Sequence, residues 1–254
     1  MAHETFTKES RTAPEGYFEV EAAGLRWLAA AGAGAAQVVR VRSVEEGRII
    51  LDNVVNARPS LAAAEAFGHA LARTHAAGAA AFGQGPDGWE GDGYIGAQEM
   101  SLVPEESWGV FYAEQRLLPY AQAAHSVGNL DTSGLRTIER IASRIADGVF
   151  DDGRPPARIH GDLWAGNILW SPKGVVMIDP SAHGGHGLTD LAMLSLFGAP
   201  HIEAILDAYA ESARLEPGWR GLVPLHQLYP LLVHSVTHSA AYGTQAVRAA
   251  ERYL

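Results

Sequence analysis

Four polar residues in the second half of the 254-residue chain have the types and spacing that phosphoryl transfer requires. His160, Asp162 and Asn167 follow the pattern H-x-D-x-x-x-x-N, and Asp179 ends an apolar run twelve residues after Asn167. Phosphoryl transfer needs a carboxylate that orients the acceptor hydroxyl, and oxygen ligands for the Mg²⁺ that bridges the phosphates. Asp162 can supply the carboxylate, and Asn167 and Asp179 can supply the ligands.

The local elements are expected to bring these side chains together. Residues 157–159 predict a short strand, and residues 167–170 and 175–178 predict two strands joined by the turn sequence Ser-Pro-Lys-Gly. A loop followed by a hairpin unites the three side chains without a long excursion of the chain, and it matches the catalytic-loop pattern of kinases. The alternative, an aspartate-rich loop that caps helices, explains neither the Asn167 spacing nor the apolar run before Asp179.

The rest of the chain divides into a small mixed unit and a mostly helical remainder. Strand patterns at 5–8, 37–42 and 48–51 surround helical spacing at 18–31. Further helices are expected over 61–78, 105–125, 133–147 and beyond 188. A Gly- and Pro-rich loop at 83–96 is long enough to be functional or mobile. We therefore expect an N-terminal lobe, residues 1–52, and a helical lobe, residues 53–254, with the catalytic segment at 159–190.

Two stretches of the catalytic segment carry a resemblance to a known family: H-G-D-L-W-A-G-N at 160–167 and D-P-S-A-H-G-G-H-G-L-T-D-L-A-M at 179–193. They resemble the fructosamine (ketosamine) kinases, relatives of the aminoglycoside and choline phosphotransferases, and Trp164 is typical of the narrower family. Weaker similarity covers most of the chain. The resemblance implies an α+β, protein-kinase-like two-lobe fold with a truncated N-terminal sheet lobe that binds nucleotide and a mostly helical C-terminal lobe.

The resemblance also implies a role for individual residues. Asp162 would be the catalytic base, Asn167 and Asp179 would bind Mg²⁺, and Lys8 would contact the α- and β-phosphates of ATP with Glu21 as its ion-pair partner. A buried Lys–Glu pair contributes little to stability by itself, so its use would be to position a phosphate. Lys8 is also one of only two lysines among 19 basic residues, and arginine does not replace a compact ammonium equivalently.

Several other residues are expected in or near the site. Trp164 would stack on the acceptor or pack within the loop, and His186 would be close to the substrate or structural. His183 and His186 could suggest zinc, but no third ligand is evident, so we expect no metal there. His160 is expected to brace the catalytic loop, and Asp190 to cap or anchor the next helix.

The sequence departs from the kinase pattern at two places. Seven residues precede Lys8, which leaves no room for an upstream hairpin with a glycine loop over the phosphates. We expect either that Lys8 and the metal hold the triphosphate alone, that a segment such as 83–96 roofs it, or that nucleotide affinity is poor. Pro180 follows Asp179, which predicts extended backbone at Asp179 and a site without a flipping switch.

Composition excludes several classes of protein. A hydrophobic content of 47% excludes a disordered chain, and the absence of cysteine excludes disulfides and thiolate metal sites. A net charge of −10 argues against a sequence-independent nucleic-acid binder. The polar N-terminus and the lack of a long apolar run predict a cytoplasmic protein with no membrane span. No coiled-coil pattern is present, and we expect a monomer.

The residues of the catalytic segment predict an ATP- and Mg²⁺-dependent kinase, and the resemblance implies that its acceptor is a sugar hydroxyl of a ketosamine. The ketosamine would be a ribulosamine or fructosamine, free or on a protein lysine, and its phosphorylation would be a deglycation step. One alternative is a kinase for an aminoglycoside, choline or a homoserine-like alcohol. The other is a non-catalytic nucleotide- or sugar-binding protein, which the missing glycine loop favours and the presence of all three chemistry-bearing residues opposes.

Overall fold

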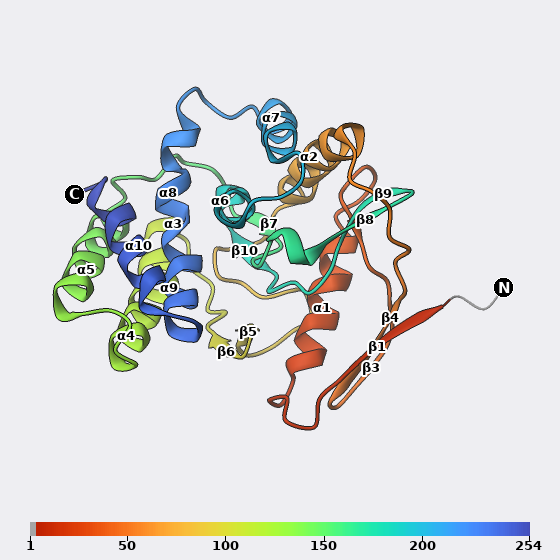
Figure 1. Ribbon diagram of the computed structural model, residues 1–254, viewed down its shortest axis with the longest axis horizontal. Helices are drawn as coiled ribbons and strands as arrows, with labels where there is room; N and C mark the ends of the chain where they lie inside the picture. Colours follow the sequence, from red (N-terminus) through yellow and green to blue (C-terminus); the bar gives the residue numbers. More distant parts are fainter. Residues whose placement is uncertain (1–3) are drawn as a thin grey trace.

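A three-stranded antiparallel sheet and one helix form the N-terminal lobe in the computed structural model, which describes residues 4–254 (Figure 1). In this sheet β1 (Thr5–Glu9) and β3 (Val41–Glu45) flank β4 (Arg48–Asp52). α1 (Tyr17–Ala29) packs on one face because apolar side chains recur at helical spacing along α1 and alternate along β4. The core between them contains Phe18, Ala22, Leu25, Ile49 and Leu51.

One short strand links this lobe to the catalytic hairpin. β2 (Gln37–Val38) pairs in parallel with β9 (Gly174–Met177), and β9 pairs antiparallel with β8 (Ile168–Ser171). The sequence predicts a single strand over residues 37–42, but the structure divides this segment between β2 and the start of β3. The N–H of Val39 donates to the main-chain O of Met177, and the chain then turns into β3 of the other sheet. The hairpin that ends at Asp179 is thereby attached to the lobe that contains Lys8.

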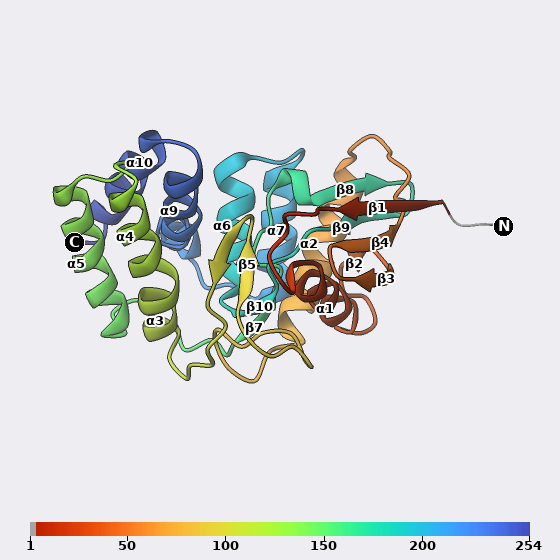
Figure 2. The same cartoon turned by 90° about the horizontal axis from the view of Figure 1, so that it is seen from below.

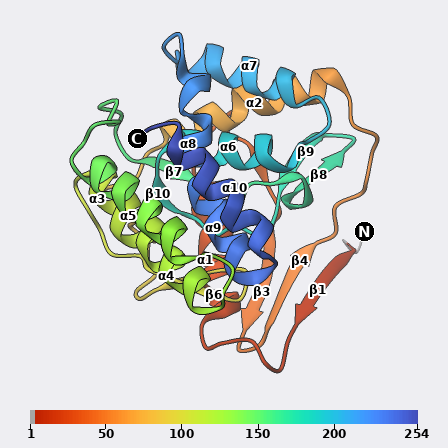
Figure 3. The same cartoon turned by 60° about the vertical axis from the view of Figure 1, so that its left-hand side comes forward.

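Helices make up most of the C-terminal lobe and surround two apolar cores. α2 and α7 lie side by side (Figure 3) and share one core with α6, while α3–α5 and α8–α10 share the other. The helix predicted at 105–125 is divided into α3, a π-helical turn and α4. The bounds are α2 (Leu61–Ala76), α3 (Trp108–Phe111), the π turn η1 (Tyr112–Leu117), α4 (Leu118–Ser126), α5 (Thr132–Ala146), η2 (Ala165–Asn167), α6 (Gly187–Phe197), α7 (Ile202–Ala213), η3 (Trp219–Leu222), α8 (Val223–His226), α9 (Leu228–Thr237) and α10 (Ala240–Glu251).

Two further strand pairs lie next to the catalytic segment. β7 (Ala157–Ile159) pairs antiparallel with β10 (His183–Gly185), and β5 (Gly93–Ile95) forms a hairpin with β6 (Gln98–Met100). β5 falls at the end of the segment predicted as a loop, residues 83–96, and β6 follows that segment. The hairpin lies between α1 and the helices α3 and α4 (Figure 2). The architecture is α+β with a helical second lobe, as the sequence predicts. Across residues 4–254, no helix is both long enough and apolar enough to cross a membrane.

Candidate active site

The catalytic loop begins where β7 ends, and His160 fixes its shape from inside. His160 is buried, its Nε2 donates to the main-chain O of Ile178 (2.8 Å), and its Nδ1 accepts from the N–H of Asp162 (3.2 Å). Burial lowers the pKa of His160, which favours the neutral ring that donates at one nitrogen and accepts at the other. His160 therefore braces the loop, in agreement with the sequence analysis.

Asp190 on α6 anchors the same loop by accepting hydrogen bonds from its main chain. Its carboxylate accepts the N–H of His160 (2.8 Å) and the N–H of Gly161 (2.9 Å), and it contacts Nε2 of His75 on α2 (3.0 Å). His75 Nδ1 in turn lies 2.8 Å from the hydroxyl of Tyr209 on α7. Burial opposes ionisation of Asp190, but its contacts with His75 and His160 hold its pKa below the usual value. Three helices thus combine to fix two main-chain N–H groups.

Sequence reasoning missed this anchor. Asp190 was expected only to cap or anchor its helix, and His75 was not among the residues expected in or near the site. The available signal was a histidine and an aspartate on helix faces that are otherwise apolar, since buried polar groups must find partners. The sequence does not show which of the buried polar groups pair.

Asp162, Asn167 and Asp179 meet between the loop and the end of β9. Asn167 Nδ2 lies 2.9 Å from Asp162 Oδ2, 2.8 Å from the main-chain O of Asp162 and 3.3 Å from the main-chain O of Asp179. Burial raises the pKa of Asp162 to about 7, the negative charges of Asp179 and Asp190 add to the rise, and the Asn167 hydrogen bond opposes it. A carboxyl group with a pKa in this range is suited to accept a proton near neutral pH.

The backbone of Asp179 differs from the sequence expectation. Pro180 predicts an extended conformation at Asp179, but its φ is 54°, in the left-handed region. This region is unfavourable for residues other than glycine, although aspartate tolerates it better than most. Asp179 Oδ1 lies 2.8 Å from Lys8 Nζ, and its main-chain O contacts Asn167, so contacts on both sides hold the residue there. These contacts override the local preference that proline imposes.

Lys8 on β1 connects the two lobes electrostatically. Its Nζ lies 2.8 and 2.9 Å from the two carboxylate oxygens of Glu21 on α1, in addition to the contact with Asp179. Burial opposes ionisation of Lys8, but the two carboxylates prevail and raise its pKa, so the ammonium form is retained. The family resemblance implies the Lys8–Glu21 pair, and the structure adds Asp179 as a second partner of Lys8.

Six residues singled out from the sequence line one pocket of about 230 Å³ between the lobes. They are Lys8, Glu21, Asp162, Trp164, Asn167 and Asp179. Tyr94 and Gly96 of the β5–β6 hairpin line the same pocket. These two residues come from the region of the predicted loop, and only its length and its glycine content drew attention to it.

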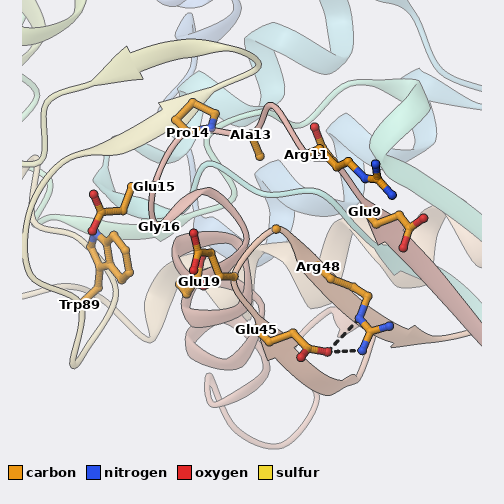
Figure 4. Close-up of a pocket in the computed structure, with 13 residues that line it drawn as sticks. Glu9, Arg11, Ala13, Pro14, Glu15, Gly16, Glu19, Glu45, Arg48 and Trp89 are labelled. Carbon is orange, nitrogen blue, oxygen red and sulfur yellow. Dashed lines mark hydrogen bonds and ion pairs between the residues drawn. The ribbon is translucent and has the colours of Figure 1, made fainter.

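A larger cavity, of about 1010 Å³, lies beside the turn between β3 and β4 (Figure 4). Its wall is rich in carboxylates, with Glu15, Glu19 and Glu45 among them, and Trp89 closes one side. No residue of the catalytic loop reaches it. The chemistry-bearing residues therefore identify the smaller pocket as the candidate active site.

His186 is not brought to that pocket. It is buried at the start of α6, where its Nδ1 accepts the N–H of Leu188 and its Nε2 lies 3.2 Å from both carboxylate oxygens of Asp152. Its ring packs against Trp108 and His226. These contacts give His186 a structural place under α6, the second of the two possibilities that the sequence left open.

His183 is buried on β10, and its environment gives a stability prediction. Its Nδ1 donates to the main-chain O of Ser181 (2.7 Å), and burial lowers its pKa to about 3, with the charge of Arg116 contributing. The folded state therefore holds the neutral ring, whereas the unfolded chain takes up a proton below about pH 6.5. His183 should reduce the free energy of unfolding as the pH falls from about 6.5 toward 3, by about 1.4 kcal/mol at pH 5.5.

Urea denaturation of wild type and His183→Gln at about pH 7.5 and pH 5.5 measures this effect. The wild type should lose about 1.4 kcal/mol more than the variant between the two pH values. Because buried His160 and His226 also have lowered pKa values, the variant should keep part of the acid sensitivity. Equal losses in the two proteins would contradict the assignment to His183.

The residues at the pocket fit a magnesium ion. Within residues 4–254 the hydrogen bonds of the Asn167 side chain all use Nδ2, which leaves Oδ1 as an acceptor beside the half-exposed Asp179 carboxylate. In the same part of the chain, no group of three or more His, Cys, Asp or Glu side chains is arranged to hold a metal. Mg²⁺ in phosphoryl-transfer sites needs no such cage, because one or two protein ligands, phosphates and water complete its shell.

A model of the fructosamine kinase family matches residues 1–254. The chain belongs to this family. A "probable ketoamine kinase" of Enterococcus faecium is 29% identical over 249 residues, which cover 98% of this chain and 87% of that protein. The crystal structure of a "putative fructosamine-3-kinase" from Thermobifida fusca matches with a TM-score of 0.90 and 44% identity, covering 98% of this chain and 86% of that one. A choline kinase from Streptococcus pneumoniae, 14% identical with a TM-score of 0.61 over 99% of this chain and 87% of its own, shares the fold alone.

Membership in the fructosamine kinase family confirms the resemblance seen in the catalytic segment and the protein-kinase-like two-lobe fold. The protein is a phosphotransferase with a hydroxyl group as acceptor. A family with this fold implies the use of ATP with a divalent metal.

Proposed function

We propose that this fructosamine kinase family member transfers the γ-phosphoryl group of ATP to a sugar hydroxyl of a ketosamine. The observation that carries the proposal is the partly buried Asp162 carboxylate, held by Asn167 at the edge of a pocket that also contains Lys8 and Asp179. This arrangement combines a proton acceptor, a cation for phosphates and oxygen ligands for a metal. The family description, fructosamine kinase, supports the acceptor class.

In the proposed reaction Asp162 orients the acceptor hydroxyl and accepts its proton. The acceptor oxygen forms a bond to the γ-phosphorus while the bond from that phosphorus to the β–γ bridging oxygen breaks, and ADP leaves. The raised pKa of Asp162 suits this role, since a base is most effective when its pKa lies near the working pH. His160 and Asp190 keep the loop in the geometry that the transfer requires.

Charge on the phosphates is balanced from two sides in this proposal. Lys8, positioned by Glu21, contacts the α- and β-phosphates, and Asn167 and Asp179 hold Mg²⁺. When bound, the ion neutralises charge that develops on the transferring group. Lys8 contacts Asp179 directly, so in this proposal the cation and the metal ligand lie side by side where the phosphates must pass.

Trp164 is proposed to contact the acceptor. Its ring lies on Gly166, where a Cβ would come within 2.3 Å of it, so the loop fixes the orientation of the indole. The side chain is nevertheless 42% exposed and lines the pocket next to Asp162. A fixed, exposed indole offers a flat apolar surface for a sugar ring or its aglycone. We propose a ribulosamine or fructosamine as substrate, phosphorylated at the sugar 3-hydroxyl. The adduct then loses this group as inorganic phosphate by elimination, and water hydrolyses the resulting carbon–nitrogen bond, which releases the amine.

The test is turnover with a panel of acceptors. Purified protein with Mg·ATP should consume ATP in the presence of a ribulosamine or a fructosamine, and the product should carry phosphate on the sugar. Choline, an aminoglycoside and homoserine serve as comparison acceptors. Turnover with one of these and none with any ketosamine would contradict the proposed substrate. Failure to bind ATP in calorimetry would contradict the proposed reaction as a whole.

Lys8→Ala should raise the KM for ATP by about 10- to 100-fold, because a hydrogen-bonded charge contact is worth roughly 1.5–3 kcal/mol. Lys173→Ala is the matched control, since Lys173 is the only other lysine and lies exposed in the turn between β8 and β9. Steady-state kinetics with varied ATP measures the effect. If both variants keep the wild-type KM, Lys8 does not contact the nucleotide.

A further inference from the structure

The β5–β6 hairpin is built firmly into the C-terminal lobe. Its residues Ile95 and Met100 are buried in the core that contains Trp108 on α3. Asp92 closes its base, because Oδ1 of Asp92 accepts the N–H of Leu102 (3.1 Å). A segment that is fixed by buried side chains and by a hydrogen bond at its base can hold a neighbouring helix in place.

From this base the hairpin and the residues before it contact the first residue of α1 and the two residues that precede α1. The hydroxyl of Tyr94 donates to the main-chain O of Glu15 (3.0 Å), and its ring lies 5.3 Å from the ring of Tyr17. Trp89 lies against Gly16, the residue before α1, where a Cβ would come within 2.9 Å of the indole (Figure 4). All three contacts fall within six residues of Glu21, the partner of Lys8.

Tyr94 also contacts the segment that follows Asp179. Its main-chain O accepts the hydroxyl of Ser181 (2.7 Å). On α1, Gly24 lies so close to this segment that a Cβ there would come within 3.1 Å of Ala182. One residue of the hairpin therefore bonds on one side to the start of α1 and on the other to the chain two residues beyond Asp179.

Alternation along β5 gives its neighbouring residues different surroundings. Tyr94 and Gly96 line the pocket with Lys8 and Asp179, whereas Ile95 lines a small cavity on the other side of Asp162. The hairpin thus forms a wall of the phosphate pocket as well as a bridge between the lobes.

We propose that Tyr94 is a positioning residue that holds α1, and with it Glu21 and Lys8, in place relative to Asp179. The proposal rests on the proposed function of Lys8 as a phosphate ligand. The ammonium reaches both carboxylates at 2.8 Å only if β1, α1 and the Asp179 segment keep their separation. We call the hydrogen bonds of Tyr94 to Glu15 and Ser181 the brace. With the brace intact, the arrangement that can bind ATP is populated before ATP binds. If the brace loosens and only a fraction of molecules is competent, apparent ATP affinity falls by that fraction, while bound complexes still react.

Tyr94→Phe tests the proposal because it removes the hydroxyl bond to Glu15 and keeps the ring. Tyr253→Phe is the matched control, since the Tyr253 hydroxyl also bonds to main chain, at Gly221 and Leu225, and lies outside the pocket. We expect Tyr94→Phe to raise the KM for ATP by about three- to ten-fold with kcat within about two-fold of wild type, and the control to change neither. Ser181→Ala, which removes the second bond of Tyr94, should shift KM in the same direction. An unchanged KM in both would overturn the proposal.

Amide hydrogen exchange tests the brace without reference to catalysis. Tyr94→Phe should speed exchange in the first two turns of α1 and leave α5 and α10 at wild-type rates, whereas Tyr253→Phe should leave α1 unchanged. Unchanged exchange in α1 of Tyr94→Phe would overturn the proposal even if KM rises. If wild type binds no ATP but α1 exchange responds as expected, the brace stands and the proposed function fails.

Discussion

Asp162→Asn should lower kcat by about 10³-fold and leave ATP affinity within a few-fold of wild type. Removing a general base commonly costs about two to four orders of magnitude in rate. The asparagine carbonyl can still accept the Asn167 hydrogen bond, so the loop should keep its shape. The phosphate contact proposed for Lys8 and the metal ligation proposed for Asp179 do not depend on this carboxylate. Single-turnover kinetics gives the rate, and calorimetry gives the affinity.

Asp207→Asn is the matched control for this substitution. Asp207 lies exposed on α7 and pairs with Arg220 on the surface, so the same chemical change there should leave kcat and affinity unchanged. Asp162→Asn with wild-type kcat would show that another group accepts the proton. A large loss of ATP affinity together with kcat would indicate that the variant disturbs the nucleotide site and not the transfer step alone.

The part of the site that could be predicted from sequence is the part that is local in the chain. Asp162, Asn167 and Asp179 lie within eighteen residues and are joined by a loop and a hairpin, so their types and spacing were enough to bring them together. Lys8 and Glu21 lie on a strand and the helix that follows it, thirteen residues apart. A sequence pattern this short predicts how its side chains lie relative to one another, because few conformations can connect elements that are so close in the chain.

Contacts between distant segments could not be predicted in the same way. His75 and Asp190 are 115 residues apart, and Ser181 and Tyr94 are 87 apart. The sequence shows that such polar groups need partners but does not say which ones. The left-handed backbone of Asp179 was missed for a related reason, since Lys8 and Asn167 impose it against the local preference of the residue before proline.

Asp190→Ala should reduce the free energy of unfolding by about 3–5 kcal/mol, because it removes one member of a buried, hydrogen-bonded charged group. The N–H groups of His160 and Gly161 and the Nε2 of His75 would lose their acceptor inside the protein. Asp190→Asn keeps one carbonyl oxygen and should cost less, which keeps the effect measurable if the alanine variant does not fold. Urea denaturation of both variants gives the values.

Tyr209→Phe tests whether the stabilisation comes from the Asp190 carboxylate or from the outer contact between His75 and Tyr209. It removes only the outer hydroxyl, which contacts His75, and should cost about 1 kcal/mol. A ranking of Asp190→Ala above Asp190→Asn above Tyr209→Phe would show that the two loop N–H groups carry most of the stabilisation. If all three variants lose the same free energy of unfolding, the Asp190 carboxylate contributes no more to stability than the Tyr209 hydroxyl does. In the expected case Asp190→Asn should also lower kcat, because the loop that presents Asp162 would lose a main-chain contact.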